Sequence, residues 1–581
     1  MYYSIVSDLS IQWIKDYYNS SPGYEISEIH RNYQIMFEFK HVIMVMTKTF
    51  LLRTEDIYMN RKLPIGIQGF EKLISDNFLY VDKTKYIYEL VHNNVPYFLC
   101  RPRRFGKSLL LSAMKAYWMG KKELFEGLAI ERLEKDNPDA WKSYPVFYFD
   151  FNGADYQQEG ALEEALNIQL NRWEADYNCK QTSSTLSGRF QNLLISAKRE
   201  TGLNSVILVD EYDKPLLDVI DNENLHDHNK SVFKGFFSTL KSFDEYIQFT
   251  FITGVSKFHK VSIFSDLNHL NDISLNETFA GLCGITDKEL NEYFPAEIEA
   301  LATHHQISVE ECLHTLKKQY DGYHFYPNSE GVYNPYSLLN AFYTKDFGTY
   351  WFETGTPTFL IKKLRNSQFD VRKFSNKTIY ASESTLKDYT GDMTDPIPLL
   401  YQTGYLTISE FDSKRRRYTL CFPNEEVKYG FLESLIPSYV PKATAGNGLD
   451  IFTLDDYIEN GETDNIRDVF TALFAGITYT TENDPFEHYF QAVIYLVFTL
   501  LGKLVQCEMH TYTGRIDCRV QTSDYIYLFE FKRDESAKAA LDQINSKEYA
   551  LPFTADNRTL FKIGVSFDSE RRKLSGWEVE K

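Results

Sequence analysis

Four short apolar runs recur in the first half of the chain, and segments with helical spacing separate them. The runs are VPYFLC (95–100), YPVFYFDF (144–151), SVILVDEYD (205–213) and YIQFTFITG (246–254). Intervening stretches such as KSLLLSAMKAYWMG repeat apolar residues three and four positions apart, which is typical of amphipathic helices. Continuous apolar strands that alternate with helices indicate a parallel sheet covered on both faces. The pattern therefore predicts a doubly wound α/β domain over residues 59–298.

The hydrophobic pattern changes twice after this domain. Residues 299–441 predict a mainly helical region with short strands, in which KRRRYTLCF (414–422) has the pattern of an exposed edge strand. KATAGNGLD (442–450) combines small residues with two glycines, so residues 442–483 are expected to be a linker and connecting segment. Residues 484–581 follow the order α-β-β-β-α-β, which predicts a second, smaller α/β domain.

The N-terminal segment, residues 1–58, shows no clear period. Either Met59 is the start of the functional chain, or the segment is an ordinary N-terminal lobe with some helix and strand. It lacks a basic stretch followed by an apolar one, so no signal peptide is expected. No apolar run approaches the roughly 18 residues that span a bilayer, and no membrane association is expected.

Composition excludes some classes of function. The net charge of −19 argues against a protein that grips nucleic acid through bulk positive charge. The seven cysteines are scattered without a C-x-x-C pair, which indicates reduced thiols in a cytoplasmic protein rather than a zinc site or a disulfide framework.

RPRRFGKS (101–108) follows the first apolar run and opens a helix. It matches the end of the phosphate-binding pattern G-x-x-x-x-G-K-[ST], but Arg101 stands where the first glycine is usual. In such a loop, backbone N–H groups and a helix N-terminus hold phosphates; Lys107 would reach the β- and γ-phosphates and Ser108 would bind Mg²⁺. We expect ATP to be bound by Arg101, Pro102, Arg103, Arg104, Phe105, Gly106, Lys107 and Ser108.

Two further strand ends complete the predicted nucleotide site. VILVDEYDKP ends its apolar run in Asp210 and Glu211, the first suited to the Mg²⁺ shell and the second to polarising the attacking water. FTFITGVSK ends in Thr253, whose hydroxyl would sense the γ-phosphate. Three such elements in order predict nucleotide binding; the alternative is an α/β domain with one basic and one solvated acidic turn.

A second constellation lies near the C-terminus. Asp517 in GRID and Glu530 in FEFK would meet on adjacent strands and hold one Mg²⁺, which prefers oxygen ligands. Lys532 projects to the same face as Glu530 and would orient or deprotonate the attacking water. Glu487 on the preceding helix is a candidate further ligand, and Gln543 on the following helix would orient the site. The alternative is a solvated ion-pair face.

These motifs together resemble the bacterial AAA-ATPase-like proteins that carry a PD-(D/E)XK nuclease-like domain at the C-terminus. LPIGIQGFEKL, YVDKTKYIYEL, RPRRFGKSLLLS, VILVDEYDKP, FITGVSKF, GRIDCRV, FEFK and ALDQI carry the resemblance, which covers residues 59–581. It implies that RPRRFGKS is a normal form of the loop and that LPIGI and YVDKT flank the adenine. It also implies a P-loop NTPase domain, a helical middle region and a C-terminal restriction-endonuclease-like domain.

We therefore expect ATP binding with slow hydrolysis, joined to a Mg²⁺-dependent nuclease that acts on nucleic acid, with DNA favoured over RNA. Oligomerisation is compatible with this architecture. Residues 484–581 contain 13 Lys and Arg against 15 Asp and Glu, so no basic footprint marks a binding face. The alternative function is a non-catalytic, ATP-operated switch whose nuclease-like domain is an interaction module.

Overall fold

The chain divides into two compact units, Met1–Lys62 and Leu63–Lys581. The computed structural model describes residues 61–93, 95–257, 264, 270–354, 360–361, 364, 369–374, 379–387, 395–439, 451–475, 486–568, 570–571 and 573–581. Two predictions, that for residues 1–58 and that for the glycine-containing stretch 442–450, lie outside these residues. The fold given below is that of the second unit.

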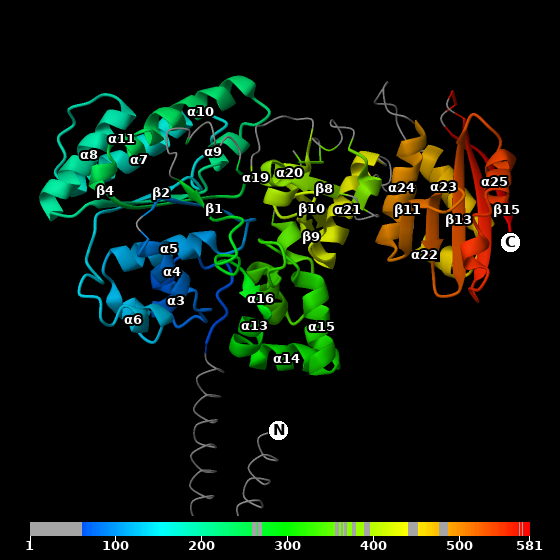
Figure 1. Ribbon diagram of the computed structural model, residues 1–581, viewed down its shortest axis with the longest axis horizontal. Coiled ribbons are helices and arrows are strands. Elements are labelled where there is room, and N and C mark those ends of the chain that lie inside the picture. Colours follow the sequence, from blue (N-terminus) through cyan, green and yellow to red (C-terminus); the bar gives the residue numbers. More distant parts are fainter. Residues whose placement is uncertain are drawn as a thin grey trace, which may run out of the picture. The chain divides into compact units, whose positions relative to one another are not determined.

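A five-stranded parallel sheet forms the centre of the first domain, as the apolar runs predict (Figure 1). Its strand order is β2-β3-β4-β1-β5, so the first strand of the chain lies between the fourth and the fifth. All neighbouring pairs are parallel. The strands are β1 (Tyr97–Cys100), β2 (Val146–Asp150), β3 (Ser205–Asp210), β4 (Ile247–Gly254) and β5 (Asn271–Asp272).

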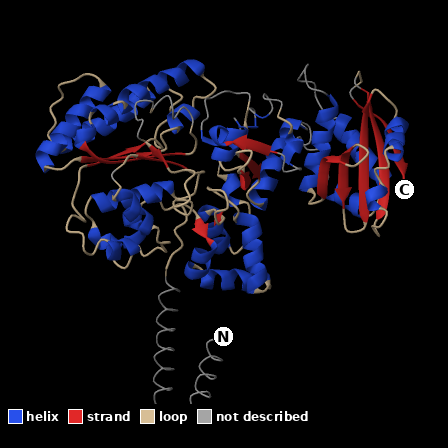
Figure 2. Cartoon of the chain, in the orientation of Figure 1, coloured by secondary structure: helices blue, strands red, loops and turns tan. Residues whose placement is uncertain are grey.

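Helices cover both faces of this sheet, which explains why its strands are apolar almost throughout (Figures 1 and 2). One face carries α3 (Phe70–Ser75), α4 (Thr84–Val91), α5 (Lys107–Trp118), η1 (Lys122–Phe125) and α6 (Ala129–Leu133). The other side holds α7 (Ala161–Asp176), α8 (Leu186–Thr201), α9 (Lys214–Leu217), α10 (Glu223–Phe237), α11 (Thr239–Ser242) and η2 (Asp244–Tyr246). The predicted doubly wound α/β domain is confirmed.

The middle region is mainly helical, as predicted, and its first elements lie before residue 299, where the predicted region begins. Its helices are α13 (Asp287–Tyr293), α14 (Pro295–His305), α15 (Val309–Tyr320), α16 (Pro335–Thr344), α17 (Tyr350–Glu353), η3 (Val371–Phe374), α19 (Glu383–Lys387), α20 (Ile397–Gln402) and α21 (Glu425–Tyr439). Its strands form two small sheets, β6 (Ile285–Thr286) with β7 (Val332–Tyr333), and β8 (Ile379–Ser382), β10 (Arg417–Cys421) and β9 (Thr407–Asp412) in that order.

The prediction that residues 414–422 form an edge strand is wrong. Strand β10 is the central strand of its sheet, with antiparallel partners on both sides. Its polar residues are accommodated because they alternate with Tyr418 and Leu420, which are buried, and because the Arg417 guanidinium lies 3.8 Å from the centre of the Tyr380 ring on β8. Alternation of polar and apolar residues therefore indicates that one face of a strand is exposed, and it does not indicate that the strand lies at the edge of its sheet.

The C-terminal domain is a mixed five-stranded sheet in the order β11-β12-β13-β14-β15. Only β13 and β14 are parallel, and α25 connects them. The predicted order α-β-β-β-α-β is found, and a further edge strand, β15, follows it. The elements are α24 (Phe486–Leu500), β11 (Leu504–His510), β12 (Arg515–Gln521), β13 (Tyr525–Arg533), α25 (Ala537–Ser546), η4 (Leu551–Phe553), β14 (Thr559–Asp568) and β15 (Lys573–Glu580).

Two helices occupy part of the segment expected to connect the middle region with this domain. They are α22 (Ile451–Glu459) and α23 (Thr463–Ala475), and α23 packs against β15. Four residues of these two helices are fully buried: Leu454, Ile458, Ile466 and Phe470.

No helix in the described part of the chain is long and apolar enough to cross a membrane.

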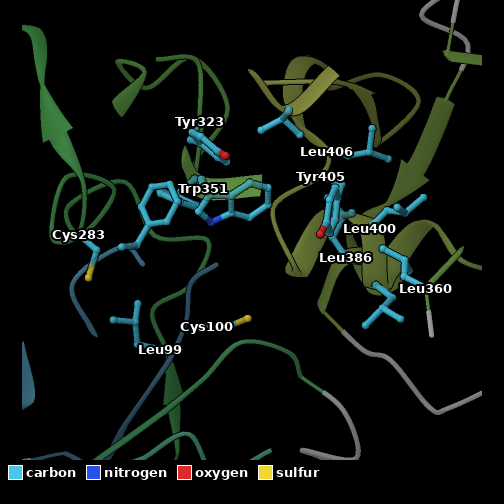
Figure 3. Close-up of a cluster of buried hydrophobic side chains, with 14 of the residues drawn as sticks. Leu99, Cys100, Cys283, Tyr323, Trp351, Leu360, Leu386, Leu400, Tyr405 and Leu406 are labelled. Carbon is cyan, nitrogen blue, oxygen red and sulfur yellow. The ribbon is translucent and has the colours of Figure 1, made fainter. Parts of the chain in front are cut away.

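The hydrophobic core continues from the parallel sheet into the middle region. Leu99 and Cys100 at the end of β1 belong to the same buried cluster as Tyr323, Trp351 and Tyr405 of the middle region (Figure 3). The rings of Trp351 and Tyr405 have their centres 5.2 Å apart. The middle region is therefore packed directly against the end of the strand that leads into residues 101–108, the predicted phosphate-binding loop, called the phosphate loop below.

Candidate nucleotide and nuclease-like sites

The phosphate loop connects β1 to α5 and has the backbone conformation of an anion-binding turn. Gly106 is the residue before α5, with a φ of 90°, and Arg104 also has a positive φ, of 65°. Within the described chain, the backbone amides of Arg104, Phe105 and Gly106 donate to no other residue. Free amides beside a helix N-terminus provide donors and partial positive charge for a phosphate group.

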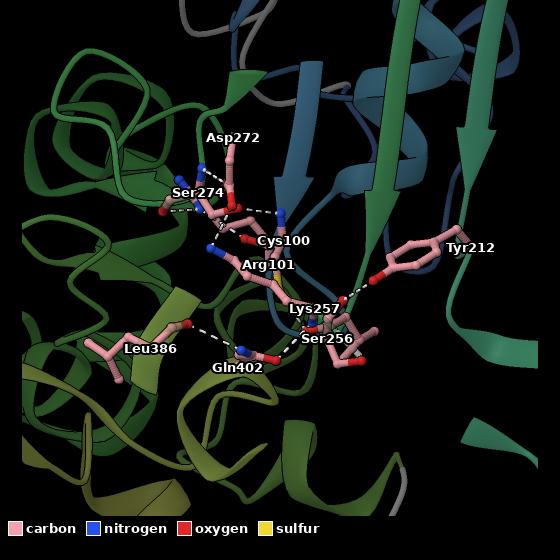
Figure 4. Close-up of polar contacts among 10 residues, drawn as sticks. Cys100, Arg101, Tyr212, Ser256, Lys257, Asp272, Ser274, Leu386 and Gln402 are labelled. Carbon is pink, nitrogen blue, oxygen red and sulfur yellow. Dashed lines mark hydrogen bonds and ion pairs between the residues drawn. The ribbon is translucent and has the colours of Figure 1, made fainter. Parts of the chain in front are cut away.

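Arg101 does not face the same side as these amides. Arg101 is 1% exposed, and its guanidinium donates to the carbonyl oxygens of Cys100 and Ser274, each at 2.9 Å (Figure 4). It also donates to the Phe279 carbonyl oxygen at 3.1 Å. It also lies 3.9 Å from the centre of the Phe325 ring, and burial lowers its pKa. The side chain that replaces the usual glycine therefore anchors the loop to the 274–279 segment.

The remaining loop residues divide between the protein interior and a cavity. Pro102 and Phe105 are buried, and the Phe105 ring meets the Tyr323 ring edge-on at 4.7 Å. Lys107 donates from Nζ to the carbonyl oxygens of Arg101 and Pro102 at 3.0 and 3.1 Å. Five predicted loop residues line a cavity of about 730 Å³: Arg103, Arg104, Gly106, Lys107 and Ser108.

The acidic strand end lies next to this cavity, but its two carboxylates differ in surroundings. Asp210 is buried; its Oδ1 accepts from Thr253 Oγ1 at 2.8 Å and its Oδ2 accepts from the Tyr148 hydroxyl at 3.2 Å. Glu211 has a positive φ of 51° and lines the cavity. Burial raises the pKa of Glu211, an effect that nearby Lys107 opposes. Neither Asp210 nor Thr253 reaches the cavity wall.

Asp213 fixes the neighbouring strand end. Its carboxylate accepts from the amides of Val255 and Ser256 at 3.2 and 2.6 Å and from Ser256 Oγ at 2.8 Å. Gly254 allows this close approach, because a Cβ atom there would lie 2.6 Å from the Tyr212 ring and 2.7 Å from Asp213 Oδ1. The ends of β3 and β4 are thus held together beside the cavity.

The rest of the cavity comes from the predicted LPIGI motif, from other parts of the first domain and from the middle region. Pro64, Gly66 and Ile67 line it, whereas no residue of YVDKT (80–84) does. In that second motif Asp82 Oδ2 accepts a hydrogen bond from the Ala129 amide, and Lys83 Nζ forms an ion pair with Glu289 Oε2 at 2.7 Å. The remaining lining residues are Gln68, Leu109, Asn152, Asp213, Lys214, Leu217, Asp218, Val255, Pro335, Tyr336, Leu339, Thr354 and Thr403.

The C-terminal carboxylates come together as the strand pattern predicts. Cys518 pairs with Phe529 across β12 and β13, so the preceding Asp517 lies across from Glu530. Asp517 is 6% exposed and Glu530 2% exposed, and Asp517 Oδ2 accepts from the Phe531 amide at 2.9 Å. Phe529 and Phe531 are buried on the opposite face. Burial, together with the nearby Asp517, raises the pKa of Glu530 to about 8.

The two carboxylate oxygens of Glu530 differ in their polar partners. Lys532 Nζ lies 3.7 Å from Glu530 Oε1, and Gln543 Nε2 from α25 donates to the same oxygen. Glu530 Oε2 is buried and has no hydrogen-bond partner in the described chain. A buried, acceptor-only atom without a donor fits a site for a cation or a proton.

No further metal ligand is found beside Asp517 and Glu530 among the described residues. No set of three or more His, Cys, Asp or Glu side chains among them converges in a way that could hold a metal ion. Glu487 belongs to α24, but its side chain lies outside the described part of the structure. The arrangement therefore offers two carboxylates, a lysine and a glutamine.

Several residues beside the nucleotide site were not identified from the sequence. Asp213 belongs to the VDEYDKP motif, so a third carboxylate at that strand end was a detectable signal. Tyr148 is an ordinary alternating position of β2 and carries no such signal. Tyr336 of the cavity lies more than 200 residues beyond the loop, and only the tertiary structure brings it there.

Comparison with known proteins matches these two sites with two families. A model described as predicted AAA-ATPase matches residues 64–264, and one described as PD-(D/E)XK nuclease superfamily matches residues 485–577. A relative from Azotobacter chroococcum mcd 1, named "Uncharacterized protein in vnfD 5'region", is 35% identical over an alignment of 541 residues; the match covers 90% of this chain and 99% of the relative. No solved structure matches.

The chain belongs to the bacterial AAA-ATPase-like proteins with a C-terminal PD-(D/E)XK nuclease superfamily domain. This confirms the resemblance that the sequence motifs indicated.

Proposed function

We propose that this chain binds ATP beside its phosphate loop and that its C-terminal domain is a Mg²⁺-dependent nuclease, with DNA favoured over RNA as substrate. The observation that carries the proposal is the pair Asp517 and Glu530, which are buried across from each other on adjacent strands. Two neighbouring buried carboxylates destabilise a fold unless a cation or a proton compensates them. Such pairs are expected at functional sites.

In the nuclease-like domain, Asp517 and Glu530 are the proposed Mg²⁺ ligands. Bound Mg²⁺ would supply stabilisation of the negative charge that develops on the phosphodiester group. Lys532 is proposed to orient or deprotonate the attacking water, since its amine is on the same face as Glu530. Gln543 is proposed to hold the Glu530 carboxylate in place through its amide.

In the ATPase domain, the free loop amides and Lys107 are the proposed phosphate ligands, with Arg103 and Arg104 adding charge at the cavity. Ser108 is proposed to bind the Mg²⁺ that accompanies ATP, Asp210 to hold the water shell of this Mg²⁺, and Glu211 to polarise the attacking water. Both oxygens of Asp210 already accept hydrogen bonds from Tyr148 and Thr253. Because both oxygens of Asp210 are occupied, we propose that the chain binds ATP and hydrolyses it slowly.

Cleavage of plasmid, single-stranded DNA and RNA by the full-length protein, with Mg²⁺ and with or without ATP, tests the proposal. Glu530→Gln should abolish cleavage, and Lys532→Ala should lower the rate while leaving Mg²⁺ binding intact. Lys538→Ala, which removes an exposed lysine on α25, is the matched control. Cleavage that persists in Glu530→Gln would contradict the site assignment.

The nucleotide half is tested separately by calorimetry. Lys107→Ala should lose ATP binding, whereas Lys122→Ala, an exposed lysine beyond the same helix, should retain it. Glu211→Gln should bind ATP and lose hydrolysis. Equal ATP affinity of Lys107→Ala and wild type would exclude the proposed phosphate site.

The second candidate function is a non-catalytic, ATP-operated switch with an interaction module at its C-terminus. The pairing of Lys532 with Glu530 and the excess of acidic over basic residues in 484–581 favour it. A wild type that binds ATP but neither binds Mg²⁺ at Glu530 nor cleaves nucleic acid would support this function. A cytoplasmic location belongs to both proposals; none of the seven cysteines, which all lie in the described part of the chain, forms a disulfide.

A further inference from the structure

A side chain of the middle region contacts the backbone of the phosphate loop. Trp351 lies on the short helix α17, and its indole Nε1 donates to the carbonyl oxygen of Arg103 at 3.0 Å, across 248 residues of sequence. Trp351 is 4% exposed, and its ring packs against Tyr405 (Figure 3). The position of this donor is therefore set by the core of the middle region.

This hydrogen bond determines the direction of one free amide. In a trans peptide the C=O of one residue and the N–H of the next point to opposite sides. Because the Arg103 carbonyl points to Trp351, the Arg104 amide points to the other side of the loop. Arg103 and Arg104 line the cavity, and the Arg104 amide donates to no residue of the described chain.

Two other loop carbonyls are held by a residue of the loop's own domain. Lys107 Nζ donates to the carbonyl oxygens of Arg101 and Pro102. A phosphate that attracted the Lys107 amine would weaken these two bonds. The bond from Trp351 joins two uncharged groups and its donor is buried, so it can persist when the site is filled.

One buried carboxylate connects Trp351 with the cavity wall. Glu426 at the start of α21 is 1% exposed; its Oε1 accepts from the Trp351 amide at 2.6 Å and its Oε2 accepts from Ser337 Oγ at 2.7 Å. Ser337 follows Tyr336, which lines the cavity and whose ring centre lies 5.1 Å from the Arg104 guanidinium. Glu426 is thus bonded both to Trp351 and to Ser337, the neighbour of Tyr336.

We propose that Trp351 is a positioning residue for the phosphate loop: it orients the 103–104 peptide so that the Arg104 amide binds a phosphate of the nucleotide, and Glu426 holds it there. The affinity of the nucleotide site is then set in part from outside the ATPase domain. This inference rests on the proposed ATP binding, and the Trp351 contact is separate from the phosphate ligands named above.

Trp351→Phe tests it, because phenylalanine keeps an aromatic ring and removes the donor. On the full-length protein, ATP and ADP affinities measured by calorimetry should fall about five-fold, the loss expected for one hydrogen bond. Trp118→Phe is the control: Trp118 is equally buried, but its Nε1 has no partner in the described chain, so affinity should be unchanged. Equal affinities in the two variants would overturn the inference.

A second measurement needs no variant. Hydrogen exchange of the wild type, resolved to single amides, should show the Arg104 amide slowed by saturating ATP and not by adenosine at the same occupancy. An Arg104 amide that exchanges equally fast with and without ATP would overturn the inference even if Trp351→Phe were unfolded. If wild type fails to bind ATP, or Lys107→Ala binds it normally, the proposed function itself fails.

Discussion

The buried carboxylate of Glu426 should make the stability of the protein depend on pH. Burial raises the pKa of this group from 4.5 to about 7, although hydrogen bonds from Ser337 and from the amide of Trp351 act in the opposite direction. The folded state therefore holds a proton that the unfolded state releases between pH 4.5 and 7. Stability that comes from this proton is present at pH 4.5 and is lost as pH rises toward 7.

The magnitude follows from the size of the shift. A difference of about 2.5 pKa units at roughly 1.4 kcal/mol per unit corresponds to about 3 kcal/mol of unfolding free energy. Little of this is screened by solvent, because Glu426 is 1% exposed. Glu426→Gln replaces the group with an uncharged one of the same shape, so the variant lacks this dependence.

The assay is urea unfolding of wild type and Glu426→Gln at several pH values between 4.5 and 7.5. The unfolding free energy of the variant minus that of the wild type should rise by about 3 kcal/mol across this range, while contributions from all other groups cancel. Glu433→Gln, an exposed carboxylate on the same helix, controls for the loss of charge alone. A difference that stays within about 1 kcal/mol at all pH values would refute the reasoning.

Three further outcomes test other parts of the structure. Gly254→Ala should weaken ATP affinity and lower the melting temperature, because the added Cβ would lie 2.6 Å from the Tyr212 ring; unchanged values would show that β4 shifts freely. Arg372→Ala should destabilise by roughly 3 kcal/mol in thermal unfolding, because it leaves Glu508 and Asp370 without the buried guanidinium that each now meets at 2.9 and 2.8 Å. Tyr148→Phe removes the hydrogen bond to one oxygen of Asp210, so the free energy of unfolding in urea should fall by about 1 kcal/mol. The same change should affect the rate of ATP hydrolysis more than ATP affinity. A change in ATP affinity alone would contradict the proposed role of Asp210.

The strands of the ATPase domain could be predicted because burial on both faces leaves a signal in the sequence. β1 and β3 are mostly apolar and β4 carries four large apolar residues, so their limits followed from short runs of residues. β15 was missed because it is a half-exposed edge strand in which Ser575 and Gly576 interrupt the alternation of apolar residues. With only Leu574, Trp577 and Val579 apolar, its pattern resembles that of a loop with three apolar contacts.

The candidate sites could be predicted where sequence spacing fixes geometry. Glu530 and Lys532 are two apart on one strand, so a shared face followed directly. The direction of Arg101 could not be predicted, since a basic residue in a phosphate loop has the same sequence signal whether it faces the ligand or three backbone carbonyls. The role of Trp351 could not be predicted for another reason: a hydrogen bond between residues 248 positions apart leaves no local pattern in the sequence.

The position of β1 within its sheet has a consequence for how the protein is made. β1 ends at Cys100, yet its partners are β4, which ends at Gly254, and β5. A ribosome adding 5–20 residues per second needs roughly 8 to 30 s for the intervening residues. During that time the apolar edge of β1 has no strand to pair with and the loop after it has no framework, so the nascent chain is expected to depend on chaperones and to acquire nucleotide binding only after β4 has left the ribosome.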